Sequence, residues 1–535
     1  MKRSCFRLIA LALVLTLLLS GCSLDFAGYF KNLAALFAPV SFANMTYTRP
    51  DLSRLEGVLE DCVESAAGKD LDALVGHINT FNSICNHYNT NYYLAYIHYC
   101  IDMSDAYWEA EYDYCAAQST QVQAAIDELM YALAESPLRS ELEGDNYFGA
   151  GYFDDYDGES LWTEAFTALM DREAELIRQY YSLSAKAGLM ETWTEAFYNT
   201  VGAEMEQLYV ELVLLRRQIA QEAGYESYPE FAYDFYYDRD YTPAQTAALL
   251  KDIRLELVDE YEKLGASDIW TRGLQASAEY QTRRYVKTMA QSMGGMIADA
   301  YELMEDSELY HISHGENKFD GSFEVFLPNY GVPYIFVNPT LTNYDHLTFA
   351  HEFGHFCHDY ASYGTMAGVD VAEIFSQGME YLSLQYADGG QSLVAMKLAD
   401  SLCVYVEQAA LADFEARVYS LEGDLTAAQI NQLYGQVAEE YGYGDLVDSR
   451  SYVTIPHLYT SPLYVISYVV SNDAAMQLYQ MELEKPGSGL DCYRGQLATE
   501  QTDFLTFVKW AQLTSPFEEG RIQSVKELFR KELKL

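Results

Sequence analysis

The segment HEFGHFCH at residues 351–358 constrains the fold and the chemistry of this chain more than any other stretch. The run around it contains no proline and only one internal glycine, Gly354, so we expect a helix. At about 100° per residue, His351, His355 and His358 lie on one face, and the first two can reach a single ion. Glu352 lies on the flank of that face. A zinc peptidase uses this arrangement, in which two neutral imidazoles bind Zn²⁺ and the neighbouring carboxylate takes a proton from water.

A second acidic segment, DVAEIFSQGMEYL at residues 370–382, offers a third ligand. It is predicted to form the next helix and to present Glu373 to the ion. Three protein ligands and one open position are typical of catalytic zinc rather than structural zinc. The HExxH pattern also occurs by chance. However, four of the ten histidines lie between His346 and His358, which favours a site for one zinc ion.

Three further side chains are candidates for supporting the ligands through hydrogen bonds. His358 lies one turn beyond His355 on the same face, and Asp370 and Glu380 belong to the second predicted helix. We predict that all three orient ligands. For His358, direct binding of the ion stays open as an alternative.

These segments resemble the thimet oligopeptidase and oligoendopeptidase F family of zinc peptidases. The stretch GSFEVFLPNYGVPYIFVNPTLTNYDHLTFAHEFGH resembles the strand pair that leads into the family's zinc helix, and DVAEIFSQGME resembles the helix that carries its glutamate ligand. Further on, IPHLYTSPLYVISYVV is similar to the segment that supplies the substrate-binding His and Tyr, and the tail LTSPFEEGRIQSVKELF also fits. The resemblance is clear from Leu208 onward. One departure is the gap between His355 and Glu373, which is several residues shorter than the family pattern.

The resemblance implies a mainly α-helical fold, with two helical halves around a deep channel and a small antiparallel β-sheet near the active site. It implies hydrolysis of internal bonds in oligopeptides, with Glu352 as the general base for a zinc-bound water. It also implies that His457 and Tyr468 stabilise the oxyanion, and that Tyr464 and Tyr459 bind the substrate.

The chain is divided by these predictions into four parts. Residues 1–21 are a lipoprotein signal peptide, 22–45 a tether, 46–205 an N-terminal helical region and 206–535 the catalytic region, with the zinc helix at 346–360. Helices are expected throughout the middle of the chain, where apolar residues recur at spacings of three and four. Strands are expected at 322–326 and 333–337, with a turn at LPNYG between them.

The first 22 residues have the pattern of a bacterial lipoprotein signal. A basic start precedes an apolar run at residues 8–19, which is too short to span a membrane, and the run ends in Leu-Ser-Gly-Cys. Lipidation of Cys22 would anchor the folded part to the cell membrane, facing outside the cytoplasm. An ordinary secretory signal is the alternative.

The formal net charge of −47 excludes a general attraction to nucleic acid or to anionic headgroups. The resemblance implies oligopeptide substrates as partners, and contact with the membrane is expected through the lipid alone. Two other functions stay open at this point. One is a carboxypeptidase that releases dipeptides by the same chemistry, and the other is a non-catalytic peptide-binding lipoprotein with the same fold.

Overall fold

The computed structural model describes residues 41–534, apart from 145–146, 150, 157–160, 189, 191–193, 365–366, 388–390 and 500–502. The predicted signal peptide, the lipidation site Cys22 and most of the predicted tether therefore lie outside the described residues. Within the described ranges, no helix combines the length and the apolar character that a membrane span requires.

Helices make up most of the described chain, as the apolar spacing predicts. The first helices are α3 (Leu55–Ala66), α4 (Leu71–Ile101), α5 (Ala106–Ala116), α6 (Ser119–Ala134), α7 (Arg139–Leu142), α8 (Glu164–Gly188) and α9 (Glu195–Tyr198). They are followed by α10 (Val201–Glu222), α11 (Tyr228–Phe235), α12 (Pro243–Ala266), α13 (Ile269–Gly273), α14 (Glu279–Met293) and α15 (Met296–Asp306).

The second half of the chain contains the predicted zinc helix and the helices that pack around it. They are α16 (Asp345–Ser362), α17 (Val369–Ser383), α18 (Gln391–Cys403), the π-helical turn η5 (Val404–Gln408), α19 (Ala409–Ser420) and α20 (Ala427–Glu440). The last are α21 (Pro456–Thr460), α22 (Ile466–Glu484), α23 (Ser488–Gln496), α24 (Phe504–Trp510) and α25 (Arg521–Leu533). Short 3₁₀ turns are η2 (Phe42–Asn44), η3 (Asp154–Tyr156), η4 (Leu384–Tyr386), η6 (Gly444–Leu446) and η7 (Ser451–Thr454).

Local sequence signals set several helix ends. Thr242 caps α12 and exchanges hydrogen bonds with Gln245, and Pro243 occupies the first helical position, where its missing N–H costs nothing. Gly224 follows α10 with φ +83°, a left-handed conformation that favours glycine.

The described β-structure is a three-stranded sheet in the order β1–β3–β2. Strands β2 (Ser322–Leu327) and β3 (Val332–Val337) form the predicted antiparallel pair. Strand β1 (Tyr310–Ile312) was not predicted, and it pairs with β3 in parallel. The sheet is therefore mixed rather than wholly antiparallel as expected, and β2 lies at its edge.

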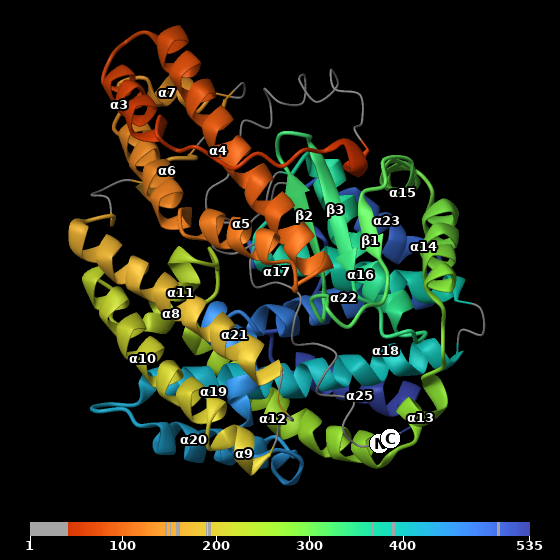
Figure 1. Cartoon of the computed structure of the whole chain (residues 1–535). Coiled ribbons are helices and arrows are strands. Elements are labelled where there is room, and N and C mark those ends of the chain that lie inside the picture. Colours follow the sequence, from red (N-terminus) through yellow and green to blue (C-terminus); the bar gives the residue numbers. More distant parts are fainter. Residues whose placement is uncertain are drawn as a thin grey trace.

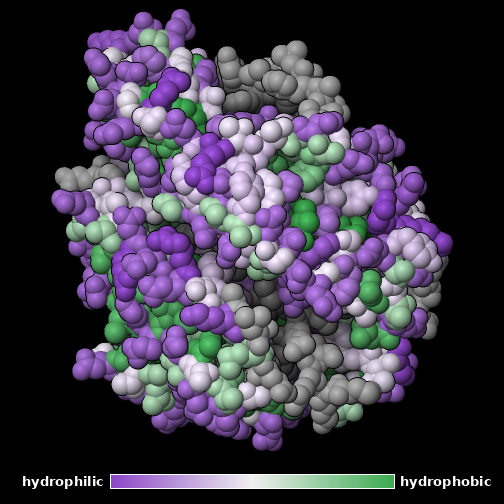
Figure 2. Space-filling model, viewed as in Figure 1, coloured by the Kyte–Doolittle hydropathy of each residue, from purple (hydrophilic) through white to green (hydrophobic). Residues whose placement is uncertain are grey.

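The sheet and three helices are stacked around the predicted site. The strands β2 and β3 pack on α16, α16 packs on α17, and α17 packs on α22 (Figure 1). One apolar core extends through both predicted regions, from Leu52 to Leu533. On the outside, hydrophilic residues cover most of the face in Figure 2, as the excess of acidic residues predicts.

Candidate active site

The two helices that carry the predicted ligands are held unusually close by a glycine. A Cβ atom at Gly354, in the middle of α16, would lie 2.4 Å from the backbone oxygen of Phe375 and 2.7 Å from Cα of Ser376, both on α17. Only glycine permits this approach, because real Cβ atoms do not come so near to backbone atoms. The spacing of the two helices therefore depends on the residue just before His355.

The close packing brings together the three predicted metal ligands, His351, His355 and Glu373. One donor atom from each lies within 4.8 Å of the other two. Oε2 of Glu373 is 3.5 Å from Nε2 of His351 and 3.8 Å from Nε2 of His355.

Glu380 on α17 lies within hydrogen-bond distance of the His351 ring. Its Oε1 is 2.9 Å from Nδ1 of His351, so Nε2 of this ring is left to face Glu373. Lys397 on α18 lies 2.9 Å from the other oxygen of Glu380, and Asp400 lies 3.4 Å from the same Lys397. Burial disfavours charge on His351. Nevertheless, Glu380, Glu373 and Glu352 together raise its pKa to about 9, so the site favours a positive charge.

The side chain of Glu352, the predicted general base on α16, is directed towards strand β2. Ser322 at the start of β2 donates a hydrogen bond of 2.7 Å to its Oε1. Burial raises the pKa of Glu352 to about 7, although His351 and Ser322 act in the opposite direction. A carboxylate with a pKa near neutrality is suited to accepting a proton and returning it.

Further carboxyl groups follow Glu352 along the contact between β2 and α16. Ser322 and Glu324 are two residues apart on β2 and therefore point to the same face. Burial raises the pKa of Glu324 well above its usual range, and the charges of Asp359 and Glu352 add to the effect. The pKa of Asp359 rises to about 7, also through burial.

His358 and Asp370 contact other residues and not the predicted metal ligands. Nδ1 of His358 lies 2.9 Å from the carbonyl oxygen of Leu497, and its ring stacks on Phe375 at 4.6 Å. Asp370 forms an ion pair of 3.4 Å with Arg239. His358 thus secures α16 against α17 and the chain after α23, and it does not belong to the ligand cluster.

Tyr468, Tyr464 and His457 come together beside the ligand helices. The Tyr468 hydroxyl lies 3.4 Å from Nε2 of His457, and the rings of Tyr464 and Tyr468 are 5.2 Å apart. The Tyr464 hydroxyl donates a hydrogen bond of 2.8 Å to Oε1 of Glu373. Burial lowers the pKa of His457 to about 4, so this imidazole is neutral.

Tyr459 is directed into the protein core. Its hydroxyl donates a hydrogen bond of 3.1 Å to the carbonyl of Met205 on α10, and its ring stacks on Tyr180 at 4.1 Å. These contacts do not favour the substrate-binding role predicted for Tyr459, because its polar atom is already engaged inside the fold. A run of tyrosines in sequence does not show which of them faces the site.

A cavity of about 90 Å³ opens beside the candidate ligands. His351, Glu352 and Tyr468 line it together with Ser322 and Gln377. A small group bound there would meet the predicted base, one predicted ligand and the predicted oxyanion donor.

The residues present fit a divalent zinc ion. Two imidazoles and one carboxylate are one of the donor sets found for catalytic zinc. Nε2 of His355 is buried and has no hydrogen-bond partner within the described chain, so this atom is available to bind a metal ion. His351 is already held in the matching orientation by Glu380.

Sequence analysis missed several residues that complete the site, among them Ser322, Ser376, Lys397 and Asp400. Ser322 bonds Glu352, and Ser376 donates a hydrogen bond of 2.8 Å to Glu373 from one turn further along α17. The sequence indicates only the contact of Ser376, because a residue three positions after Glu373 lies beside it on a helix. Nothing in the sequence around Lys397 indicates that it would lie beside Glu380.

Two family models match the chain. The model of the peptidase M3 N-terminal domain matches residues 42–159, and the model of peptidase family M3 matches residues 311–499. The second match includes the candidate ligands, Glu352 and the segment with His457 and Tyr468. Sequence comparison with curated proteins gives no match.

Solved structures of similar fold cover nearly the whole chain. One assigned to oligoendopeptidase F has a TM-score of 0.82 at 21% identity and covers 92% of this chain and 99% of its own. The structure of PZ peptidase A with an inhibitor has a TM-score of 0.82 at 20% identity, with the same coverage of both chains. A structure assigned to oligoendopeptidase F from Bacillus anthracis str. Ames gives 0.79 at 21% identity, covering 93% and 99%. At these identities the similarity establishes the fold.

Proposed function

Because this chain belongs to peptidase family M3 and is therefore a metallopeptidase, we propose that it hydrolyses internal peptide bonds of oligopeptides with one zinc ion. The observation that carries the proposal is the convergence of His351, His355 and Glu373 beside Glu352. The zinc, the preference for internal bonds and the roles of individual residues are all parts of this proposal.

His351, His355 and Glu373 would hold Zn²⁺, which when bound supplies a Lewis acid that polarises water and the substrate carbonyl. Glu352 takes the proton of the attacking water and later returns it to the leaving amine. Ser322 holds the carboxylate of Glu352 in place for both transfers, through the bond to Oε1. Glu380 keeps Nε2 of His351 directed at the ion.

Tyr468 supplies the hydrogen bond that the developing oxyanion requires. Burial raises the pKa of its hydroxyl well above the usual range, so it remains a donor at any physiological pH. In this role His457 donates its Nε2–H to the Tyr468 hydroxyl, 3.4 Å away, and so leaves the Tyr468 proton for the oxyanion. Tyr464 acts on the ligand set through Glu373.

Two substitutions test the proposal together. Glu352→Gln removes the base but preserves its shape, so zinc content should stay at one ion per chain while turnover is lost. His355→Ala removes a ligand, so both zinc and turnover should be lost. Zinc is measured by elemental analysis and turnover with a quenched peptide. Normal turnover by Glu352→Gln would contradict the mechanism.

The two alternatives are separated by one substrate. A quenched peptide blocked at both ends is cleaved by an endopeptidase but not by a carboxypeptidase that releases dipeptides. A peptide-binding lipoprotein would bind this peptide without cleaving it, even with zinc loaded. We also expect that intact casein is not degraded, since the channel implied by the resemblance admits only unfolded peptides.

We further propose attachment to the membrane by a lipid on Cys22, which is supported by the basic, apolar and Leu-Ser-Gly-Cys pattern of residues 1–22. Each buried CH₂ of an acyl chain contributes about 0.8 kcal/mol, so several chains give stable anchoring. Cys22→Ala should release the protein from membranes or leave it unprocessed. Unchanged membrane association would contradict lipidation.

A further inference from the structure

We propose that Arg239, which follows α11 and touches no predicted ligand, is a positioning residue that holds the turn before α22 so that Tyr468 faces the metal site. The inference rests on the proposed function, because it assigns Tyr468 to the reaction. The turn is formed by Pro462, Leu463, Tyr464 and Val465 and leads directly into α22.

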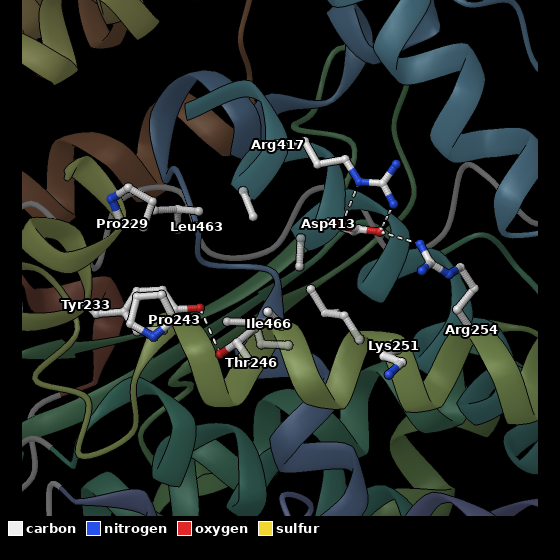
Figure 3. Close-up of a pocket in the computed structure, with 14 residues that line it drawn as sticks. Pro229, Tyr233, Pro243, Thr246, Lys251, Arg254, Asp413, Arg417, Leu463 and Ile466 are labelled. Atoms are coloured by element: carbon white, nitrogen blue, oxygen red, sulfur yellow. Dashed lines mark hydrogen bonds and ion pairs between the residues drawn. The ribbon is translucent and has the colours of Figure 1, made fainter. Parts of the chain in front are cut away.

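The turn has a backbone conformation that needs outside support. Leu463 has φ +65°, in the left-handed region that a leucine rarely adopts. Such a residue persists only where its surroundings fix it, and such residues cluster at functional sites. Behind the turn, Leu463 and Ile466 line a second cavity of about 140 Å³, together with Tyr233, Thr246 and Pro243 (Figure 3). The turn therefore borders a cavity on this side, although Leu463 itself is buried.

Hydrogen bonds from distant side chains supply this support. Arg239 donates to the carbonyl of Leu463 at 3.0 Å and to the hydroxyl of Ser467 at 2.8 Å. The Tyr237 hydroxyl donates to the carbonyl of Pro462 at 2.6 Å. The N–H of Leu463 donates to Oε1 of Glu415 on α19 at 2.8 Å. Both backbone polar groups of Leu463 are thus bound by side chains rather than by a helix or strand.

Arg239 is itself fixed on every side. Its side chain is fully buried, and its guanidinium lies over the rings of Tyr233 at 4.4 Å, Tyr237 at 4.3 Å and Tyr241 at 5.6 Å. Its Nε forms the ion pair with Asp370 at 3.4 Å. Since Asp370 lies three residues before Glu373 on α17, Arg239 ties the turn to the same helix that carries the third ligand.

These contacts join two parts of the site that the sequence separates widely. One side of the guanidinium holds the turn that leads to Tyr468, and the other holds the first turn of the glutamate helix. A planar guanidinium can serve several acceptors at once, whereas an ammonium group cannot reproduce this geometry. We therefore infer that the number and direction of the donors matter, and not the charge alone.

The test is a comparison of Arg239→Lys with Arg521→Lys. Arg521 is a buried arginine paired with Asp473 at 2.9 Å, so it controls for the general cost of replacing a buried guanidinium. We expect both variants to bind one zinc ion. Arg239→Lys should lower kcat by ~10- to 100-fold with little change in KM, because a displaced catalytic group costs rate, while Arg521→Lys should stay near the wild-type rate.

A double-mutant cycle with Tyr468→Phe distinguishes positioning from a loss of stability. Once the Tyr468 hydroxyl is gone, Arg239→Lys should cost less than ~3-fold in kcat, because effects on one functional unit do not add. If Arg239→Lys does not fold, Tyr237→Phe carries the same cycle, since it removes only the bond to Pro462. An equal cost in both backgrounds, or a wild-type kcat for the variant, would overturn the inference. Full activity of Glu352→Gln would instead overturn the proposed function.

Discussion

Helices α16 and α17 place their functional side chains by regular helical spacing, whereas residues 457–468 depend on contacts with distant parts of the chain. On the helices, His351 and His355 share a face because they are four residues apart, and one glycine sets the distance to Glu373. In the second region, Arg216 on α10 donates to the carbonyls of Leu458 and Tyr459, and Arg239 supports the turn before α22. The proposed ligands are thus brought together by short-range spacing, whereas the residues proposed to stabilise the oxyanion are positioned by long-range contacts.

The largest expected effect comes from separating the two ligand helices with Gly354→Ala. The added Cβ would collide with the backbone of Phe375, so the helices must move apart at a cost of ~1–3 kcal/mol. We expect zinc affinity and activity to be nearly abolished, as measured by zinc titration and peptide turnover. Gly76→Ala on α4 is the control, since nothing lies within 4 Å there, and it should stabilise the protein by ~0.5–1 kcal/mol. Full activity of Gly354→Ala would show that the close packing is not needed.

The second-largest effect is expected from Tyr468→Phe, and it should differ in kind from the effect of Tyr464→Phe. Tyr468→Phe should lower kcat by ~10²- to 10³-fold and leave zinc binding intact, because it removes the proposed oxyanion donor. Tyr464→Phe should instead weaken zinc binding, because it removes the hydrogen bond to Glu373. Zinc titration and steady-state kinetics on both variants check the pair. If the two phenotypes were exchanged, the roles given to the two residues would be wrong.

A smaller effect is expected from Glu380, which hydrogen-bonds the proposed ligand His351. Glu380→Gln should weaken zinc affinity by ~10- to 100-fold, because it weakens the partner that orients His351. Activity should recover when excess zinc is added, which shows that only affinity is affected. Glu407→Gln is a matched control, since Glu407 is buried and bonds Tyr261 on a different helix. Competition with a chelator measures both variants, and equal zinc affinities would argue against the role of Glu380.

The smallest effect on activity is expected from Glu415→Gln, which preserves the acceptor for the N–H of Leu463. Activity should stay within ~3-fold of wild type, because an amide oxygen replaces one carboxyl oxygen. Burial raises the pKa of Glu415 to about 8 from 4.5, so the folded wild-type protein binds this proton more tightly than the unfolded chain. Ionisation therefore costs folding stability as pH rises from about 4.5 to about 8.

The glutamine variant avoids this cost, so its free energy of unfolding relative to wild type should increase across that range. The difference should level off above pH 8. Denaturant unfolding at several pH values measures it. A stability difference that does not change with pH would show that Glu415 is ionised in the folded state.

The same contrast explains what could be predicted from sequence. Helices α16 and α17, the β2–β3 pair and the clustering of His351, His355 and Glu373 follow from short-range spacing, and the structure confirms these elements and brings the three residues together. Strand β1 was missed because three residues carry no recognisable alternation. Arg239, Arg216 and Lys397 were missed because their partners are far away in sequence, and only tertiary packing brings them together. The contacts of Tyr459, for which we predicted substrate binding, could not be foreseen for the same reason, since Tyr180 and Met205 are distant from it in the chain.

The carboxyl groups between β2 and α16 also affect how the whole molecule behaves in solution. The formal charge of −47 counts each of them as ionised. Burial raises the pKa of both Glu324 and Asp359, that of Asp359 to about 7, so the native protein binds protons there more tightly than the unfolded chain does. It should therefore migrate in an electric field as a less negative particle than its sequence suggests. Unfolding exposes these groups to water, which lowers their pKa values, so unfolding at neutral pH should release protons.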